Sequence, residues 1–403
     1  MKTKIGIIRE GKTPPDNRVA FSPKQCKEIQ AKFSDVQIFI QSSPHRCFTD
    51  NEYLDEGLIL QENLNECDIL FGVKEVSKEH LIPNKTYFFF SHTKKKQSYN
   101  QGLMQTLISK NIKLVDYECL TFNDGQRILG FGYWAGIVGA HNGLLTYGKK
   151  NNLFELKKVH TLSNFQELKE SYEGLQLPNI KIALTGTGRV SKGVIDIMQY
   201  LDIKQVSKND FLYKTFEYPV FVQLKGEDIY ARKDDSSYDR NDFHKNASEY
   251  CCTFLEYTAV ADILMNGGYW DKNIPRLFEI KDVKNPAFKM NVIADITCDV
   301  NGSVPCTLEA TTIQDPVFGF NKNTFEKEMP FQNNNQIIDI MSVDNLPNEL
   351  PRDASRYFGS HLMLEVLPHL LENTTSKVIE KATICQNGKL TKDFEYLSDY
   401  AYV

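Results

Sequence analysis

The sequence has no long hydrophobic run, and this absence narrows the class of protein. No stretch approaches the roughly 18 consecutive apolar residues that a membrane-spanning helix needs. The start, MKTKIGIIRE, has only a four-residue apolar run before Arg9, which is too short for a signal peptide. Positive charge is not in excess either, because the formal net charge is −5. We therefore expect neither a membrane nor nucleic acid as a partner.

Paired cysteines are also lacking. The nine cysteines are an odd number and form no CxxC motif, and Cys251 and Cys252 are adjacent. This usage is typical of reduced thiols, so we expect a cytoplasmic protein and predict no metal site.

What the sequence does contain is the alternation of strand and helix patterns that is typical of α/β proteins. The length of 403 residues predicts two domains. The composition, with 41% hydrophobic and 25% charged residues, is that of an ordinary globular protein. Ser22 and Pro23 are typical of a helix start, and FNDGQRILGF predicts a short hairpin. The predicted strands of the first 130 residues are KIGIIRE, VQIFIQ, DILFGV, TYFFFS and IKLVDYE. Such alternation favours a parallel sheet.

The same pattern predicts the domain organisation. We expect two Rossmann-like domains, each a parallel sheet flanked by helices, with a cleft between them. Residues 1–138, completed by 341–403, would form the substrate domain, and residues 139–340 an inserted dinucleotide-binding domain. KDDSSYDRNDFHKNASEY predicts a surface excursion, NVIADITCDV a buried strand, and LPRDASRYFGSHLMLEVLPHLLE a long amphipathic helix.

A glycine turn begins the predicted second sheet. KIALTGTGRVSKGVIDIMQYL, residues 181–201, predicts a strand, a turn and an amphipathic helix. Glycines in the turn let the backbone approach a pyrophosphate, and the helix N-terminus supplies free N–H donors. Gly193 would allow the helix to lie close to the sheet. The predicted cofactor contacts here are Gly186, Thr187, Gly188, Arg189 and Val190.

Two features depart from the usual dinucleotide fingerprint. The spacing is G-x-G-x-x-x-x-G, and no acid stands about 20 residues on, where a ribose-binding carboxylate is expected. Ser207 stands near that place, and we predict it as a further cofactor contact. Lys204 or Lys208 near the ribose would favour a 2′-phosphate, although a solvated surface lysine is the alternative. The cofactor is therefore NAD or NADP, with a slight preference for NADP.

Four polar residues stand where strands of the first domain should end. Lys74 follows ILFGV, His92 follows YFFFS and Glu118 follows LVDY, while Arg127 lies in the hairpin. The carboxyl edge of an open α/β sheet lines its ligand crevice, so these residues are candidates for acid–base chemistry and carboxylate binding. An ordinary ion pair between Glu118 and Arg127 is the alternative.

Several motifs resemble the L-lysine-forming saccharopine dehydrogenases and their alanine dehydrogenase relatives: REGKTPPDNRVAFSP, GVKEV, FFFSHTKKKQ, DYE and GFGYWAGIVG. The second half is similar to the lysine–2-oxoglutarate reductase half of bifunctional aminoadipic semialdehyde synthases. That likeness is carried by GTGRVSKG, YDRNDFHKNASEY, NGGYWDKNIPRL, ADITCDVNGSV, TTIQDP, SVDNLPNELPRDAS and IEKATICQNGKL. The resemblance extends nearly from end to end.

This resemblance implies a reductive condensation. The ε-amine of L-lysine attacks the keto carbon of 2-oxoglutarate, water leaves, and a reduced nicotinamide converts the imine to saccharopine. In the family, acid–base roles fall to a lysine and a histidine that match Lys74 and His92, and an acid matching Glu118 adjusts the lysine. The matching cations that would bind the substrate carboxylates are Arg18, Lys95 and Arg127. Asp299 matches an acid close to the nicotinamide and the substrate.

Two other interpretations stay open. An alanine dehydrogenase-like or opine-type dehydrogenase would keep Lys74 and His92 but would need fewer cations, because its substrates are smaller. A non-catalytic dinucleotide-binding regulator would need neither residue. The sequence determines neither the physiological direction of the reaction nor the oligomeric state, so a homo-oligomer is left open.

Overall fold

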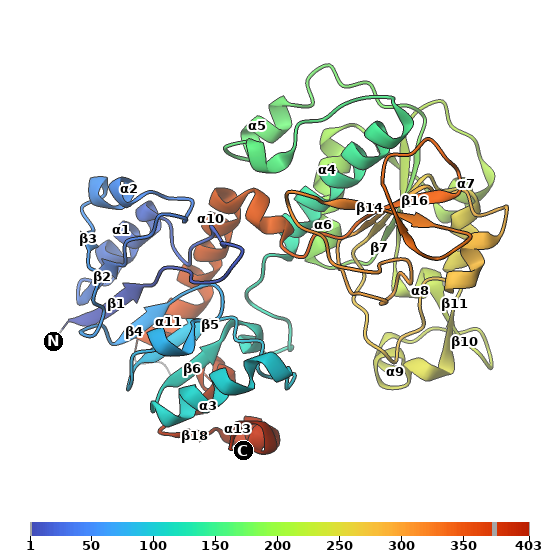
Figure 1. The fold of residues 1–403 in the computed structure, drawn as a ribbon. Coiled ribbons are helices and arrows are strands. Elements are labelled where there is room, and N and C mark those ends of the chain that lie inside the picture. The colour runs from blue at the N-terminus through green and yellow to red at the C-terminus, as the bar shows by residue number, and fades with distance from the viewer. Residues whose placement is uncertain (1, 373–376, 403) are drawn as a thin grey trace. The chain divides into compact units, whose positions relative to one another are not determined.

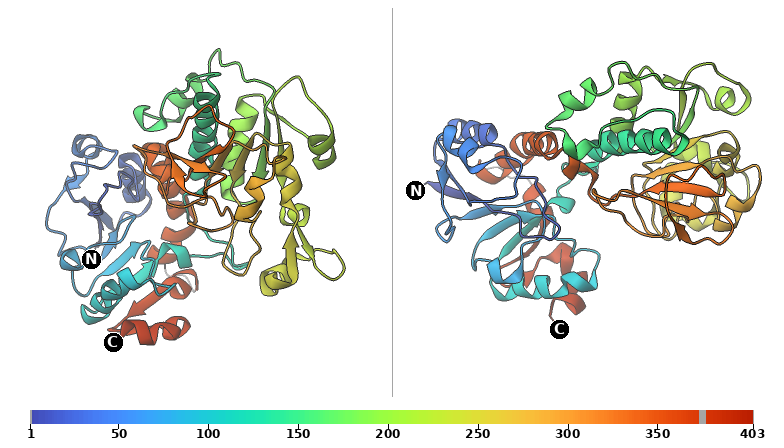
Figure 2. Two further views of the ribbon diagram at one scale, coloured as in Figure 1. Left: turned by 45° about the vertical axis from the view of Figure 1, so that its right-hand side comes forward. Right: turned by 45° about the horizontal axis from the view of Figure 1, so that its top comes forward.

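The computed structural model describes residues 2–372 and 377–402 and divides into two compact units. The first unit comprises the described residues of 1–131 and 351–403, and the second comprises residues 132–350. Our predicted boundaries at 138/139 and 340/341 fall inside helix α4 (Gly132–Asn151) and strand β16 (Ile337–Met341), which both lie in the second unit. Figure 2 shows the red C-terminal end beside the cyan part of the first unit.

The first unit contains an eight-stranded sheet of order β18-β17-β6-β5-β4-β1-β2-β3 (Figure 1). Strands β6 to β3 in this order are parallel, whereas β17 and β18 are added antiparallel at one edge. The predicted parallel sheet is therefore confirmed. The strands are β1 (Thr3–Ile7), β2 (Val36–Ile40), β3 (Ile59–Leu60), β4 (Ile69–Phe71), β5 (Thr86–Phe89), β6 (Lys113–Asp116), β17 (Thr383–Gln386) and β18 (Lys389–Leu390).

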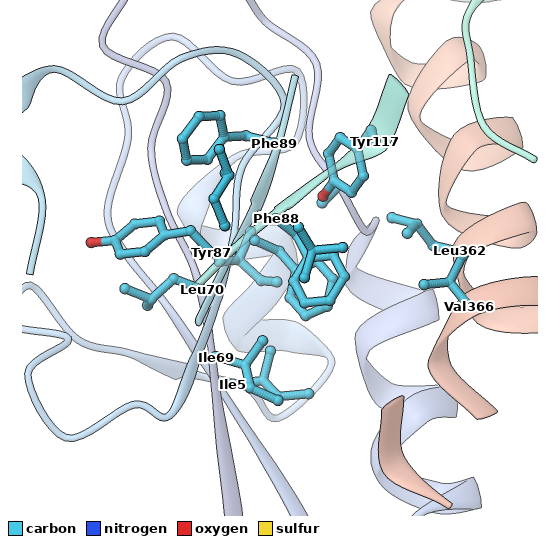
Figure 3. Close-up of a cluster of buried hydrophobic side chains, with 14 of the residues drawn as sticks. Ile5, Ile69, Leu70, Tyr87, Phe88, Phe89, Tyr117, Leu362 and Val366 are labelled. Atoms are coloured by element: carbon cyan, nitrogen blue, oxygen red, sulfur yellow. The ribbon is translucent and has the colours of Figure 1, made fainter. Parts of the chain in front are cut away.

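Helices cover this sheet and complete its core. The helices are α1 (Pro23–Lys32), α2 (Asp50–Asp55), α3 (Gln101–Ser109), α10 (Pro351–His361), α11 (Leu367–Leu371), α12 (Val378–Ala382) and α13 (Ser398–Ala401). Helix α1 begins at Pro23 after Ser22, as predicted. A π-helical turn joins α10 to α11, and from it the buried Leu362 and Val366 reach the aromatic cluster around Phe88 (Figure 3). The strands are apolar on both faces because helices cover both.

The second unit contains another eight-stranded sheet, of order β15-β14-β16-β13-β12-β7-β9-β8. Strands β16 to β8 in this order are parallel, and β14 and β15 close the other edge antiparallel. Besides β16, the strands are β7 (Lys181–Thr185), β8 (Lys204–Gln205), β9 (Val220–Leu224), β12 (Ile263–Asn266), β13 (Val292–Asp295), β14 (Val317–Asn321) and β15 (Lys327–Glu328). Helices α5 (Phe165–Glu170), α6 (Arg189–Tyr200), α7 (Lys208–Tyr213) and α8 (Gly226–Ile229) accompany α4 in this unit.

Helices α4 and α6 lie side by side in this unit, and two glycines make their close approach possible (Figure 1). A Cβ atom at Gly193 would overlap the Tyr133 carbonyl of α4, and one at Gly136 would overlap the Val190 carbonyl of α6. Gly193 therefore accommodates a neighbouring helix, and our prediction that it serves contact with the sheet is corrected. The reason is that α4 belongs to this unit.

The polar segment predicted as a surface excursion has structure of its own. It contains helix α9 (Arg240–Lys245) and lies between strands β10 (Tyr230–Arg232) and β11 (Tyr250–Cys252), which pair antiparallel. Phe243 and Tyr250 are buried and pack together edge to face. Among the described residues, no helix is long and apolar enough to span a membrane.

Candidate functional site

Parallel strands of the first unit bring three predicted residues to one sheet edge. Lys74 follows β4, His92 follows β5 and Glu118 follows β6, and β5 pairs with both neighbours. In parallel sheets this carboxyl edge is where ligands bind. The three residues, which lie far apart in the sequence, therefore stand after neighbouring strands at one edge of the sheet.

Lys74 is held through its backbone by a buried carboxylate. Glu10 Oε1 accepts the Val73 N–H at 2.7 Å, and Glu10 Oε2 accepts the Lys74 N–H at 2.8 Å. Burial and the neighbouring Asp16 raise the pKa of Glu10 to about 8. Burial and the nearby positive charge of Arg18 lower the pKa of Lys74. A lysine with a lowered pKa loses its proton more readily near neutrality, as a general base must.

His92 has an acidic partner that the sequence analysis did not predict. His92 Nδ1 and Glu75 Oε1 are joined by a 2.6 Å hydrogen bond, and Lys12 Nζ lies 3.2 Å from Glu75 Oε2. Burial opposes ionisation of Glu75, but the His92 hydrogen bond and the nearby charges lower the pKa of Glu75 to about 2. A carboxylate on Nδ1 orients the imidazole and leaves Nε2 for a substrate.

A second buried carboxylate organises the loops that carry His92 and Glu118. Asp116 is fully buried at the end of β6 and accepts the Ser91 N–H at 3.0 Å, the Ser91 hydroxyl, and the Glu118 N–H at 2.7 Å. Asn100 also donates to the Ser91 carbonyl at 2.9 Å. These bonds immobilise the residue before His92 and the backbone of Glu118.

Arg18 is buried, and its guanidinium already contacts other side chains of the first unit. Its guanidinium donates to both carboxylate oxygens of Asp16, at 2.9 and 2.6 Å, and stacks 4.2 Å from the centre of the Phe131 ring. Burial alone would raise the pKa of Asp16, but the Arg18 charge and hydrogen bonds hold it well below its usual value. A substrate carboxylate at Arg18 would therefore share the guanidinium with Asp16.

The other predicted cations differ in their surroundings. Arg127 lies 2.8 Å from Glu118 Oε1, so the ion pair considered from the sequence forms. Thr121 and Arg127 form an antiparallel bridge around the turn at Gly125, which confirms the predicted hairpin. Lys95 is exposed on the loop after β5.

A cavity of about 430 Å³ opens beside Lys74 in the first unit. Its charged lining residues are Arg9, Glu10, Glu62, Lys74, Glu75 and His80. Both carboxylates and cations line it, so the cavity suits a ligand that carries an ammonium group as well as a carboxylate.

In the second unit, the glycine turn leaves β7 as predicted. Gly186 has φ of 93°, and a Cβ there would lie 2.8 Å from the Gly267 carbonyl oxygen, so only glycine fits. Gly188 precedes α6, and a Cβ placed on it would meet no atom within 4 Å. Thr187 is exposed, whereas Arg189 and Val190 are partly buried at the start of α6. A glycine backbone in open space before a helix N-terminus fits a pyrophosphate.

Ser207 does not lie beside this turn. It follows β8, an edge strand, and its hydroxyl accepts the Asp210 N–H to cap α7. Strand β9 lies between β8 and β7, so the strand next to the glycine turn ends at Leu224 and Lys225. A cavity of about 400 Å³ runs from the turn to the end of β9, and Ser207 is not in its lining. Lys225, which directly follows β9, is in that lining. The role predicted for Ser207 stays a prediction.

A buried polar network supports the Asp299 loop. Asn266, at the end of β12, donates to Asp295 Oδ1 at 2.9 Å and to the Ser303 hydroxyl at 2.8 Å, and accepts from Thr185 at 2.7 Å. Burial raises the pKa of Asp295. Asp299 itself is exposed four residues beyond β13. The network connects the end of β7 with the loop after β13.

The residues that the sequence analysis missed are the supporting acids and the amide: Glu10, Asp16, Glu75, Asp116, Asn266 and Asp295. The one sequence feature that could have pointed to them is their position along the chain. Glu75 follows Lys74 directly, and Asp116, Asn266 and Asp295 each end an apolar strand segment. Position alone did not distinguish them from solvated residues.

Residues 6–138 match the family described as alanine dehydrogenase/PNT, N-terminal domain. The chain is 30% identical to mitochondrial alpha-aminoadipic semialdehyde synthase of Bos taurus, an alignment that covers 98% of this chain and 48% of that protein. It is 25% identical to saccharopine dehydrogenase (NAD(+), L-lysine-forming) of Yarrowia lipolytica, covering 91% of each. The chain thus spans about half the length of the synthase relatives, and the resemblance found in the sequence is confirmed.

Two solved structures confirm the fold. An L-alanine dehydrogenase superposes with a TM-score of 0.64 at 15% identity, covering 99% of this chain and 100% of that chain. A transhydrogenase from Sinorhizobium meliloti superposes with a TM-score of 0.63 at 13% identity, covering 96% and 100%. The predicted class, two Rossmann-like sheets flanked by helices, is therefore correct.

Proposed function

We propose that the chain is an NAD(P)-dependent saccharopine dehydrogenase of the L-lysine-forming type, that is, a lysine–2-oxoglutarate reductase. The observation that carries this proposal is the sheet edge of the first unit, where Lys74, with its lowered pKa, and the His92–Glu75 pair stand on neighbouring strands. Relatives named for this chemistry align along nearly the whole chain.

The proposed chemistry needs proton transfers at two atoms. Lys74 accepts a proton from the substrate ε-ammonium, so that the free amine attacks the keto carbon of 2-oxoglutarate. His92 then donates a proton to the carbinolamine hydroxyl, which leaves as water and gives the imine. Glu75 stabilises the histidine when it carries the proton, and the Glu118–Arg127 pair offers a cation for a carboxylate. A bound reduced nicotinamide supplies the hydride.

Residues of the second unit fit that dinucleotide. The cradle formed by Gly186, Thr187 and Gly188 at the start of α6 would hold the pyrophosphate. Of the two cofactors we propose NADP(H), because Lys225 and Arg240 line the cavity at the glycine turn and would offer positive charge to a 2′-phosphate. A cytoplasmic location stays a prediction, and the oligomeric state stays open.

A direct assay tests the proposal. Absorbance at the reduced-nicotinamide band should fall only when L-lysine and 2-oxoglutarate are both present, and mass spectrometry should detect saccharopine. Pyruvate or alanine replacing one substrate is the matched control. Turnover with the smaller substrates alone would support the alanine dehydrogenase-like alternative, and no turnover with any pair would support a non-catalytic regulator.

A further inference from the structure

We propose that residues 392–401 form a positioning segment, which fixes the loop after β5 through Tyr396, Asp399 and Tyr400 so that the Lys95 ammonium binds a carboxylate of the keto acid. The inference deepens the proposed function and rests on its assignment of a dicarboxylic keto acid as substrate. It gives a role to a part of the first unit that the proposed proton transfers do not use.

The positioning segment is a firm support for a loop. It consists of a 3₁₀ helix, Lys392–Leu397, followed directly by helix α13, Ser398–Ala401. Phe394, Leu397 and Tyr400 are buried in the core of the first unit. Helix α13 also packs beside α3, which follows the same loop (Figure 1). Burial of these apolar side chains fixes the segment to the rest of the unit.

Two tyrosine hydroxyls of the segment hold the backbone of the loop on either side of Lys95. The Tyr396 hydroxyl donates to the Lys94 carbonyl at 2.9 Å, and the Tyr400 hydroxyl donates to the Gln97 carbonyl at 2.5 Å. Burial raises the pKa of Tyr400 to about 12, so its hydroxyl keeps the proton that it donates. The backbone that carries Lys95 is therefore fixed at both ends.

A third contact separates Lys95 from the lysine that follows it. Asp399 Oδ1 lies 2.5 Å from Lys96 Nζ. Lys96 has φ of 53°, and its N–H donates to the Thr93 carbonyl at 2.9 Å, which closes a tight turn around Lys95. Lys95 itself is exposed and, within the part of the chain that the structure describes, forms no ion pair. Its ammonium is thus the one on this turn that is available to a carboxylate.

His92 stands on the same loop but is held by other groups. Its imidazole is bonded to Glu75, and the preceding Ser91 is bonded to Asp116. The loop therefore has two supports, one for the proton-transfer residue and one for Lys95. Loosening the second support should weaken binding of the keto acid and leave the proton transfers nearly unchanged.

Replacing single hydroxyls tests this division. Tyr396→Phe and Tyr400→Phe should each raise the KM for 2-oxoglutarate about 3- to 10-fold, the effect of one lost hydrogen bond between uncharged groups. The kcat and the KM for L-lysine should stay within about twofold. Tyr402→Phe is the matched control, because the Tyr402 hydroxyl accepts the Leu390 N–H at 2.9 Å, away from the loop, and this variant should leave all three constants unchanged. A fall in kcat with an unchanged KM for 2-oxoglutarate would overturn the proposal.

Calorimetry of 2-oxoglutarate binding tests whether the tyrosine acts through Lys95. Lys95→Met should raise the dissociation constant about 10- to 100-fold, as loss of a charge-assisted hydrogen bond does. In the Lys95→Met background, Tyr396→Phe should have no further effect, because the group that it positions is absent. An equal further loss would indicate a general structural role and overturn the proposal, as would unchanged affinity in Lys95→Met or no binding to the wild-type chain. The expected losses in a chain without turnover would keep the positioning segment and overturn the proposed function.

Discussion

His92 has a backbone conformation that is uncommon for a non-glycine residue. Its φ is 52°, in the left-handed region, which costs of order 1–3 kcal/mol for such a residue. The constraint comes from the flanking residues, because Asp116 holds Ser91, and Glu75 holds the imidazole. Strain that neighbouring hydrogen bonds maintain in this way is typical of functional sites.

Replacing either acid–base residue should abolish most turnover. We expect Lys74→Met and His92→Gln each to lower kcat by about 10²–10⁴-fold, the usual contribution of a positioned proton-transfer group. The double variant should lose less than the product, because the residues act in one sequence of steps. Steady-state kinetics measure the losses, and nucleotide affinity by calorimetry serves as the control. Wild-type rates in both variants would make these residues ordinary surface groups.

The Glu75–His92 pair should make stability depend on pH in the acid range. The pKa of Glu75 is lowered to about 2 from an ordinary 4.5. Its contribution is therefore fully present above pH 4.5 and is lost as the pH falls from 4.5 towards 2, at most about 3 kcal/mol. Urea unfolding of the wild type and of Glu75→Gln at several pH values measures this. The difference in unfolding free energy between the two should shrink on acidification, and a constant difference would contradict the prediction.

At the scale of elements, Gly188, which precedes α6, and Gly193, within it, have opposite surroundings. Gly193 lies against the backbone of α4, whereas the space beyond Gly188 is open. A packing glycine and a glycine that faces open space therefore lie five positions apart in the sequence. This contrast gives a matched pair of substitutions.

Gly193→Ala should destabilise the chain by about 1–3 kcal/mol or more, because its Cβ overlaps a backbone carbonyl that cannot move without shifting a helix. Gly188→Val should leave the unfolding midpoint nearly unchanged but should weaken nucleotide binding strongly, because the side chain fills the place of the pyrophosphate. Thermal unfolding and calorimetry measure the two effects. The same loss of stability in both variants, or unchanged nucleotide affinity in Gly188→Val, would contradict the assignment.

At the scale of the whole molecule, the candidate residues divide between the two units. The acid–base residues and Arg127 belong to the first unit, and the glycine turn and Lys225 belong to the second. Substitutions should therefore affect binding of the keto acid and of the nucleotide separately.

Arg127→Met tests this separation. It deletes a charge-assisted hydrogen bond worth about 1.5–3 kcal/mol, so the 2-oxoglutarate constant should rise about 10- to 100-fold. The dissociation constant for NADPH should stay within about twofold, because the arginine belongs to the other unit. A similar loss of affinity for both ligands would indicate that Arg127 has a structural role through its ion pair with Glu118.

The sequence by itself determined most of the strands and helices of this protein and where its candidate site residues stand along the chain. Hydrophobic strand segments ending in Lys74, His92 and Glu118 needed only local patterns, because strand alternation and turn residues act over a few positions. The helix start at Pro23 and the glycine turn at Gly186 were predictable for the same reason. The excursion was not, since its polar surface residues conceal the few aromatic residues, such as Phe243, that bury its core.

Only the tertiary structure decided which side chains meet. Strand order inserts β9 between β7 and β8, so that Lys225 and not Ser207 lines the cavity at the glycine turn. The contact of Glu75 with His92 and the three bonds to Asp116 join residues from different loops. Pairing between strands and burial of a carboxylate depend on contacts between distant parts of the chain, which no local pattern encodes.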